Sequence, residues 1–283
     1  MNQQIVNALF ETHAIRVCQA DYPFWYTSGK LGPFYINTHF LYGSEESAIA
    51  LLTLIEEAAA GDRCRFINII FEAMDATYRS NPIYKMVIDK VILAAKEMNF
   101  DFISGGERRD FFFSVLAAYY LKVPHLSIFK DGSSFYSSAD LSVTVPSSEV
   151  DLKGKKSLHI VDLITEASSF TRAWIPVIRA LEAEMTNALT VIDRLQGGRE
   201  VLTAENIGMT SLLEIDAALF EAASTTGDID AEQLALVKTF LEKPEEFMPD
   251  FLQKHPNFIK QQILLGGKNE ERARLAIEKG FAD

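Results

Sequence analysis

Between residues 101 and 193, short apolar runs alternate with segments of helical pattern, and this alternation restricts the fold more than any other feature. The apolar runs are "FDFISGG", "PHLSIFK", "KSLHIVDLIT" and "NALTVIDR", and the helical segments are "FFFSVLAAYYLK" and "SFTRAWIPVIRALEAEM". Strands that alternate with helices form a mainly parallel sheet with helices on its faces. Ligands bind at the carboxyl ends of such strands, so the site is expected in the loops after Ile103, Phe129, Ile164 and Ile192.

The flanking segments have other patterns. Before residue 101 we predict an opening helix over residues 2–20, a hairpin at "FWYTSGKLGPFYINTHFLYGS", and helices at "SEESAIALLTLIEEAAAG" and "NPIYKMVIDKVILAAKEMN". From about residue 221 a polar link, "STTGDID", leads into helical sequence with breaks at Pro244, Pro249, Pro256 and "LGGKNEE". We therefore expect one domain over residues 1–220 and a C-terminal helical extension over residues 221–283.

Bulk properties exclude several classes of protein. The chain is 48% apolar, which is enough for a core, but no stretch approaches the roughly 20 apolar residues of a membrane span. The N-terminus is too polar for a secretory signal, so we expect a cytoplasmic protein without a membrane partner. A net charge of -12 argues against nucleic acid but permits a small anionic ligand, because local cations decide such binding.

Metal and hydrolase motifs are missing from the sequence. The two cysteines lie far apart, and the five histidines lack the spacing of a zinc site or a hydrolytic triad. We therefore predict no metal site formed by the chain itself. The sequence also lacks the G-x-S-x-G, P-loop lysine and G-x-G-x-x-G motifs.

The segment "IVDLITEASSF" carries the strongest candidate site. It places Asp162 at the end of a strand and Thr165, Ser168 and Ser169 in a turn before a helix that begins near Phe170. Backbone N–H groups and a helix N-terminus at such a turn bind anions, and Asp162 could accept hydrogen bonds from sugar hydroxyls. The alternative is an ordinary strand-to-helix loop with serine caps.

Three further loops carry weaker signals. In "SGGERRDFF" two glycines precede Arg108 and Arg109, whose guanidinium forks suit phosphate or carboxylate, although an internally paired charge cluster is equally compatible. In "TSGKLGPFYINTHF" Lys30 lies in a glycine turn, where a lone lysine is usually solvated. In "TVIDRLQGG" Asp193 and Arg194 would, taken alone, form a local ion pair.

Taken in order, these segments resemble the orotate phosphoribosyltransferases. "YTSGKLGPFYINTHFLYG" resembles their N-terminal hairpin, "FDFISGGERRD" their second ligand loop, "LHIVDLITEASSF" their phosphoribosyl-pyrophosphate loop and "TVIDRLQGGRE" the Asp-Arg stretch near their end. "NIGMTSLLEID" is similar to their closing strand and helix. The resemblance covers roughly residues 1–220 and is interrupted by a helical insertion at about residues 62–98.

The resemblance implies a type I phosphoribosyltransferase fold, an α/β fold with a mainly parallel five-stranded sheet and a small hood, in a homodimer. The reaction it implies transfers ribose 5-phosphate from phosphoribosyl pyrophosphate to orotate, with magnesium, through an oxocarbenium-like transition state. Such catalysis rests on positioning and charge stabilisation.

The same resemblance implies a set of site residues. The base side matches Lys30, Phe34, Tyr35, Thr165 and Arg194. Arg109 falls where the family has a cation that contacts pyrophosphate, and Ser168 and Ser169 match the residues that hold the 5-phosphate. Asp162 and Arg109 are the candidate catalytic residues, and the predicted substrate-binding set also includes Arg108, Lys130, Glu166 and Ala167.

The phosphate loop departs from the family pattern at three positions. The family has two adjacent acids, whereas this chain has Val161 and then Asp162. Where the family has a small residue and then glycine, this chain has Glu166 and Ala167. A carboxylate facing the phosphate would repel it by roughly 1 kcal/mol if well solvated.

The expected catalytic loop departs further. The family has a mobile stretch rich in cations, whereas "IFKDGSSFYSSADLSVTV" offers only Lys130. Each missing donor to the leaving pyrophosphate could cost on the order of a hundredfold in rate. We therefore predict a non-catalytic or much weakened relative that binds a nucleotide-like or phosphate ligand. The alternative is an active phosphoribosyltransferase, a glycosyltransferase of pyrimidine nucleotide metabolism that acts on orotate or a related base.

Overall fold

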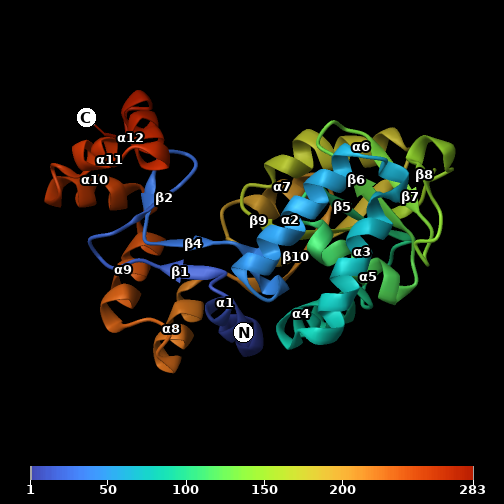
Figure 1. The fold of residues 1–283 in the computed structure, drawn as a ribbon, viewed down its shortest axis with the longest axis horizontal. Coiled ribbons are helices and arrows are strands. Elements are labelled where there is room, and N and C mark those ends of the chain that lie inside the picture. The colour runs from blue at the N-terminus through green and yellow to red at the C-terminus, as the bar shows by residue number, and fades with distance from the viewer. Residues whose placement is uncertain (1, 283) are drawn as a thin grey trace. The chain divides into compact units, whose positions relative to one another are not determined.

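The structure is a computed structural model that describes residues 2–282. The chain divides into two compact units (Figure 1). Unit 1 comprises the chain up to Ala14 together with Thr38–Ile215. Unit 2 comprises Ile15–Asn37 and the chain from Asp216 onward. The N-terminal hairpin is therefore grouped with the C-terminal helices rather than with the central sheet.

A seven-stranded sheet forms the centre of unit 1. Its order is β11 (Gly208–Glu214), β10 (Glu184–Asp193), β9 (Lys156–Ile164), β5 (Phe102–Gly106), β6 (His125–Ile128), β7 (Ser134–Ser137) and β8 (Thr144–Pro146). The first five strands of this order are parallel, as predicted, and β7 and β8 extend one edge antiparallel. The mainly parallel α/β architecture is thus confirmed.

The direction in which successive strands are added to the sheet reverses at β5. From β5 it passes through α5 (Phe111–Leu121) to β6 on one side, whereas β9 pairs with β5 on the other. A crevice forms beyond the carboxyl ends of the two strands at which the order reverses. The loops after β5 and β9 therefore share one opening.

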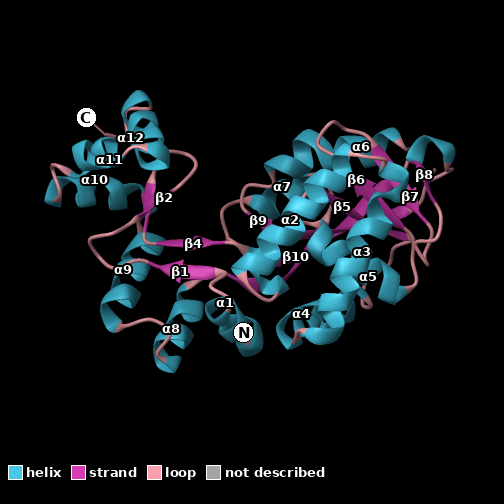
Figure 2. Ribbon diagram, viewed as in Figure 1, coloured by secondary structure: helices cyan, strands magenta, loops and turns pink. Residues whose placement is uncertain are grey.

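Helices cover both faces of this sheet (Figure 2). In that view α3 (Arg63–Ser80), α4 (Pro82–Ala95) and α5 lie below it, and α6 (Ile175–Ala180) and α7 (Gly198–Ala204) lie above it. Right-handed crossovers that run in opposite directions across a sheet place their helices on opposite faces. The residues expected as a helical insertion, 62–98, contain α3 and α4.

Local sequence signals explain several helix ends. In α2 (Glu45–Ala60) the Ser44 hydroxyl accepts a hydrogen bond from the Ser47 amide at 3.1 Å, and Gly61 follows the last turn. The α4 helix begins with Pro82. The α1 helix (Gln3–Glu11), however, ends well before residue 20, so that prediction is wrong over its second half, which contains β1 (Ile15–Val17).

Unit 2 contains two short antiparallel pairs and five helices. The strand pairs are β1 with β4 (Phe34–Ile36) and β2 (Phe24–Trp25) with β3 (Leu31–Gly32), which confirms the predicted hairpin. The helices are α8 (Ala217–Thr226), α9 (Ala231–Glu242), α10 (Pro244–Lys254), α11 (Phe258–Leu265) and α12 (Gly267–Glu278). Pro249 lies inside α10, so the predicted break there is wrong.

The α10 helix continues through Pro249 because its apolar face is packed. Phe247, Met248 and Phe251 are all buried, and their packing offsets the backbone hydrogen bond that a proline inside a helix loses. Within the described part of the chain, no helix is both long and apolar enough to span a bilayer.

Candidate functional site

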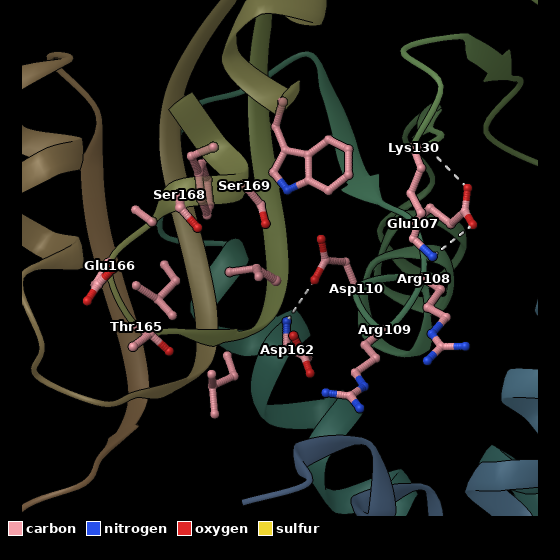
Figure 3. Close-up of a pocket in the computed structure, with 16 residues that line it drawn as sticks. Glu107, Arg108, Arg109, Asp110, Lys130, Asp162, Thr165, Glu166, Ser168 and Ser169 are labelled. Carbon is pink, nitrogen blue, oxygen red and sulfur yellow. Dashed lines mark hydrogen bonds and ion pairs between the residues drawn. The ribbon is translucent and has the colours of Figure 1, made fainter. Parts of the chain in front are cut away.

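A cleft of about 460 Å³ lies at the shared opening beyond β5 and β9 (Figure 3). Its lining comes from Glu107–Asp110, Lys130, Val161–Phe170 and Trp174. The structure therefore brings together the predicted residues Arg108, Arg109, Lys130, Asp162, Thr165, Glu166, Ala167, Ser168 and Ser169.

The loop from Thr165 to Ser169 forms one wall of the cleft and contains a left-handed residue. Ala167 has φ 52°, a conformation that costs an L-residue roughly 1–2 kcal/mol. The Ala167 carbonyl accepts hydrogen bonds from the Phe170 and Thr171 amides at 3.0 and 3.3 Å, at the start of the π-helix Phe170–Trp174. Alanine thus takes a conformation that glycine adopts without strain, and the turn forms without glycine.

Glu166 does not close the cleft. Its side chain is exposed, and in Figure 3 its carboxylate lies on the side of the loop away from Asp162 and Ser169. Arg172 donates through Nε to the Ser168 carbonyl at 3.1 Å, so this arginine fastens the loop and does not neutralise Glu166. Repulsion of a bound phosphate by Glu166 is therefore weakened by solvent.

The two glycines at the end of β5 allow close packing. A Cβ on Gly106 would collide with the Trp174 indole, and a Cβ on Gly105 would collide with the Ser114 hydroxyl. The two residues therefore let β5 approach its neighbours closely. Trp174 in turn lines the cleft.

Two of the three cleft cations are engaged by acids. Arg108 pairs with Glu56 of α2. Lys130 has its ammonium 3.5 Å from the Glu107 carboxylate, which also accepts a hydrogen bond from the Lys130 amide at 3.1 Å. Arg109 forms no ion pair within 4.0 Å among residues 2–282, so its guanidinium is the cation most available to an anionic ligand.

Asp110, which the sequence analysis did not select, lies beside Asp162. Its Oδ1 accepts a hydrogen bond from the Asp162 amide at 3.2 Å, and its Oδ2 accepts one from the Gly106 amide at 3.1 Å. Burial, followed by the nearby Asp110 carboxylate, raises the pKa of Asp162 to about 7, although Arg109 opposes the shift. Asp162 thus shares the cleft with a second carboxylate, from the loop between β5 and α5.

Behind this pair lies a buried polar chain. His159 has Nε2 3.6 Å from Asp110 Oδ2, and its Nδ1 lies 2.9 Å from the Ser104 hydroxyl. The Ser104 and Ser157 hydroxyls are 2.7 Å apart, and all three side chains are buried. The interior of unit 1 behind the cleft therefore contains a hydrogen-bonded polar chain, formed by side chains of β5 and β9.

Comparisons with known proteins agree with this geometry. No family model matches the chain. Adenine phosphoribosyltransferase of Mycoplasma mobile is 26% identical over 150 residues, covering 50% of this chain and 86% of that protein. Adenine phosphoribosyltransferase of Oenococcus oeni is 25% identical over 160 residues, covering 52% of this chain and 89% of that protein.

Solved structures match over more of the chain. Orotate phosphoribosyltransferase of Francisella tularensis superposes with a TM-score of 0.53 at 13% identity, covering 84% of this chain and 98% of that one. UMP synthase of Leishmania donovani superposes with a TM-score of 0.57 at 18% identity. The match covers 85% of this chain and 41% of that longer protein. The chain has the type I phosphoribosyltransferase fold.

In this phosphoribosyltransferase-like chain the segment after β6 forms a short turn. Arg63 of α3 donates to the Asp131 carboxylate at 2.7 Å and also to the Ser133 hydroxyl, and its guanidinium lies 4.3 Å from the centre of the Phe129 ring. Hydrogen bonds from Ser133, with a further one from Arg63, lower the pKa of Asp131 to about 2. The turn that carries Lys130 is therefore fastened to α3.

The predicted base-side residues of the hairpin lie in unit 2 and have partners there. Lys30 pairs with Glu245 of α10 at 2.7 Å. Phe34 is buried, with ring centres 4.9 Å from Phe220 and 5.7 Å from Phe240. The structure thus makes Phe34 a core residue of unit 2.

Tyr35 also has neighbours within unit 2. Its hydroxyl accepts a hydrogen bond from the Asn37 amide group at 2.5 Å, and its ring centre lies 5.5 Å from that of Phe24. Both contacts come from the same N-terminal hairpin segment, so they fix the Tyr35 side chain locally.

Arg194 lies at the end of β10 and does not line the cleft. Its amide donates to the Ile164 carbonyl at 2.9 Å, and its Nε is buried without a hydrogen bond in the described structure. Asp193 pairs instead with Arg199 at 3.1 Å, so the expected Asp193–Arg194 ion pair is wrong.

Proposed function

We propose that the protein binds phosphoribosyl pyrophosphate in the cleft and transfers its ribose 5-phosphate to a nucleobase. The observation that carries the proposal is Ala167, a non-glycine residue held left-handed in the loop that joins β9 to a helix at the reversal point of the sheet. Strain of this kind persists at functional sites, where surrounding structure maintains it. The loop amides would then receive the 5-phosphate.

The other cleft residues suit the remaining parts of this substrate. Asp162 would accept hydrogen bonds from the ribose hydroxyls, and Arg109 would hold the pyrophosphate. As the bond to pyrophosphate breaks, positive charge develops on the ribose and negative charge on the leaving group. Arg109 and the ammonium of Lys130 would stabilise the leaving group, and the loop would fix the ribose for attack by the base.

Magnesium would enter as part of the substrate. Across residues 2–282 no group of three or more His, Cys, Asp or Glu side chains is placed to hold a metal ion. Phosphoribosyl pyrophosphate offers phosphate oxygens that Mg²⁺ prefers, so we expect the complex of the two to bind as one ligand.

The second candidate function is that of a binding protein with weak or absent turnover. Two ion pairs favour this alternative. Arg108 is engaged by Glu56 and Lys130 by Glu107, so each would have to leave an acid before stabilising pyrophosphate. A binding protein needs only the phosphate loop and Arg109, whereas a fast enzyme needs all the cations.

The base is left open between two groups of relatives. The structural neighbour from Francisella tularensis, which the chain covers over 98% of its length, is an orotate phosphoribosyltransferase, whereas the two relatives found by sequence are adenine phosphoribosyltransferases. We propose orotate or a related base, with Thr165 of the cleft as its candidate contact. A homodimer is part of the same proposal.

A turnover assay tests the function. Purified protein is mixed with phosphoribosyl pyrophosphate, magnesium and either orotate or adenine, and pyrophosphate release is followed. Release that depends on one base, and that falls at least tenfold in Arg109→Gln, supports the transferase. Saturable binding of phosphoribosyl pyrophosphate without release supports the binding protein, and absence of both binding and release would refute both.

A further inference from the structure

We propose that Asp110 and Asp162 act as a carboxyl pair that takes up a proton when a doubly charged anion enters the cleft. The proposal rests on the proposed function, because it concerns the same phosphate-binding cleft. It adds Asp110 to the site as a positioning residue and makes the affinity of the site for phosphate-like anions depend on pH.

The geometry of Asp110 supports both of these roles. Asp110 joins two strand ends, since its carboxylate accepts from the Gly106 amide of β5 and from the Asp162 amide of β9. The side chain itself is buried, yet it lines the cleft, and Figure 3 shows it next to Asp162. Asp110 therefore sets the spacing of the two loops and places a second negative charge next to Asp162.

Only one of the three cations that line the cleft is available to the carboxyl pair. Arg109 faces Asp162 and stabilises its charge, whereas Arg108 and Lys130 are engaged by Glu56 and Glu107. A doubly charged anion would compete with both carboxylates for Arg109. Protonation of one carboxyl group removes a repulsion and supplies an O–H donor to the anion, so anion and proton should bind together.

Other titratable groups around the cleft do not replace this pair. His39, in the 3-10 helix Thr38–Tyr42, has a pKa lowered to about 3 by burial and then by Arg109 and Arg108, so it stays neutral between pH 6 and 8. Glu166 is exposed on the far side of the loop. His159 contacts Asp110 from behind and is present in every variant below, which separates its contribution from that of the pair.

The experiment measures sulfate affinity by calorimetry at pH 6 and pH 8 on the full chain. Sulfate is the probe because it keeps two charges over this range. We expect about tenfold tighter binding at pH 6, which is the full effect of linking one proton to a group that titrates near pH 7. Titration at pH 7 in buffers of different ionisation enthalpy should show proton uptake.

Three variants separate the pair from other causes. Asp162→Asn should abolish the pH dependence and raise the affinity at pH 8 toward the value that the parent shows at pH 6. Asp110→Asn should reduce it, because Asp162 then loses the neighbouring charge but keeps the larger effect of burial. Asp89→Asn, which removes an exposed carboxylate on α4, should retain the tenfold ratio.

Each contrary result has a distinct meaning. Sulfate binding that is equal at both pH values in the parent would overturn the carboxyl pair and leave the phosphate site intact. A pH dependence that survives in Asp162→Asn would overturn it as well, even if Asp110→Asn failed to fold. Absence of sulfate binding at both pH values overturns the inference, and absence of phosphoribosyl pyrophosphate binding in addition overturns the proposed function.

Discussion

The Asp162 amide donates to Asp110 Oδ1 at 3.2 Å, and this hydrogen bond joins the ends of β9 and β5 at the cleft. Two acids that are 52 residues apart in sequence therefore share one environment.

Asp162→Asn should stabilise the protein at pH 8 but not at pH 4. The native state raises the pKa of Asp162 to about 7, so folding favours the protonated form. That contribution is complete below the ordinary pKa of about 4 and is lost as pH rises through about 7. Urea titration at pH 8 should show a free energy of unfolding that is on the order of 2 kcal/mol higher in Asp162→Asn than in the parent. Equal or lower stability of the variant at pH 8 would contradict the assignment.

Ala167→Gly should raise the free energy of unfolding by about 0.5–1 kcal/mol. Glycine removes the left-handed strain at φ 52°, and part of that gain is lost to the greater freedom of glycine in the unfolded chain. The matched control is Ala50→Gly on the exposed face of α2, which should lower it by about 1 kcal/mol. Destabilisation by both substitutions in urea titrations would show that residue 167 is unstrained.

Glu166→Gln should change sulfate affinity by less than about threefold, because an exposed carboxylate directed away from the cleft repels a bound anion weakly. The double variant Glu166→Thr with Ala167→Gly should raise phosphate affinity further, since it also frees the backbone. Calorimetry measures both. A tenfold gain from Glu166→Gln alone would mean that its carboxylate turns toward the phosphate.

Arg109→Gln should weaken binding of phosphoribosyl pyrophosphate by at least tenfold, whereas Arg108→Gln should cost less. Arg109 has no ion pair within reach in the described structure, but Arg108 must leave Glu56 before it can contact a ligand. Equal losses in the two variants would indicate that Arg108 leaves Glu56 readily, and no loss in either would place the pyrophosphate elsewhere.

Phe34→Ala should destabilise the protein by about 3–5 kcal/mol, because the ring is buried between Phe220 and Phe240. Glu245→Gln, which breaks the exposed ion pair with Lys30 in the same unit, should cost less than about 1 kcal/mol. Thermal unfolding compares the two. A small effect of Phe34→Ala would favour its predicted role at the base.

The loop after β9 was predictable because strand, loop and helix are contiguous there. An aliphatic run, a polar turn and a helix start suffice to place Asp162 and Ser169 near one another. The neighbour of Asp162 was not predictable in this way. Adjacency in sequence directs attention to Val161, whereas the second carboxylate comes from Asp110 through the pairing of β5 with β9.

Partners that lie far away in sequence also explain where the structure differs from the predictions at other positions. For Arg108 the sequence left an internally paired cluster open, but its partner Glu56 comes from α2, and Lys130 pairs with Glu107 of the loop after β5. The second half of the predicted opening helix became strand β1 because pairing with β4 overrides local periodicity. Tertiary pairing of this kind carries no signal at the level of a single segment.

Titration calorimetry with phosphoribosyl pyrophosphate and magnesium, on the parent and on Arg109→Gln, tests the central claim most directly. The account predicts one saturable site per chain in the parent and at least tenfold weaker binding in the variant. Absence of saturable binding to the parent, or equal affinity in the two proteins, would contradict the assignment of the cleft as a phosphoribosyl pyrophosphate site.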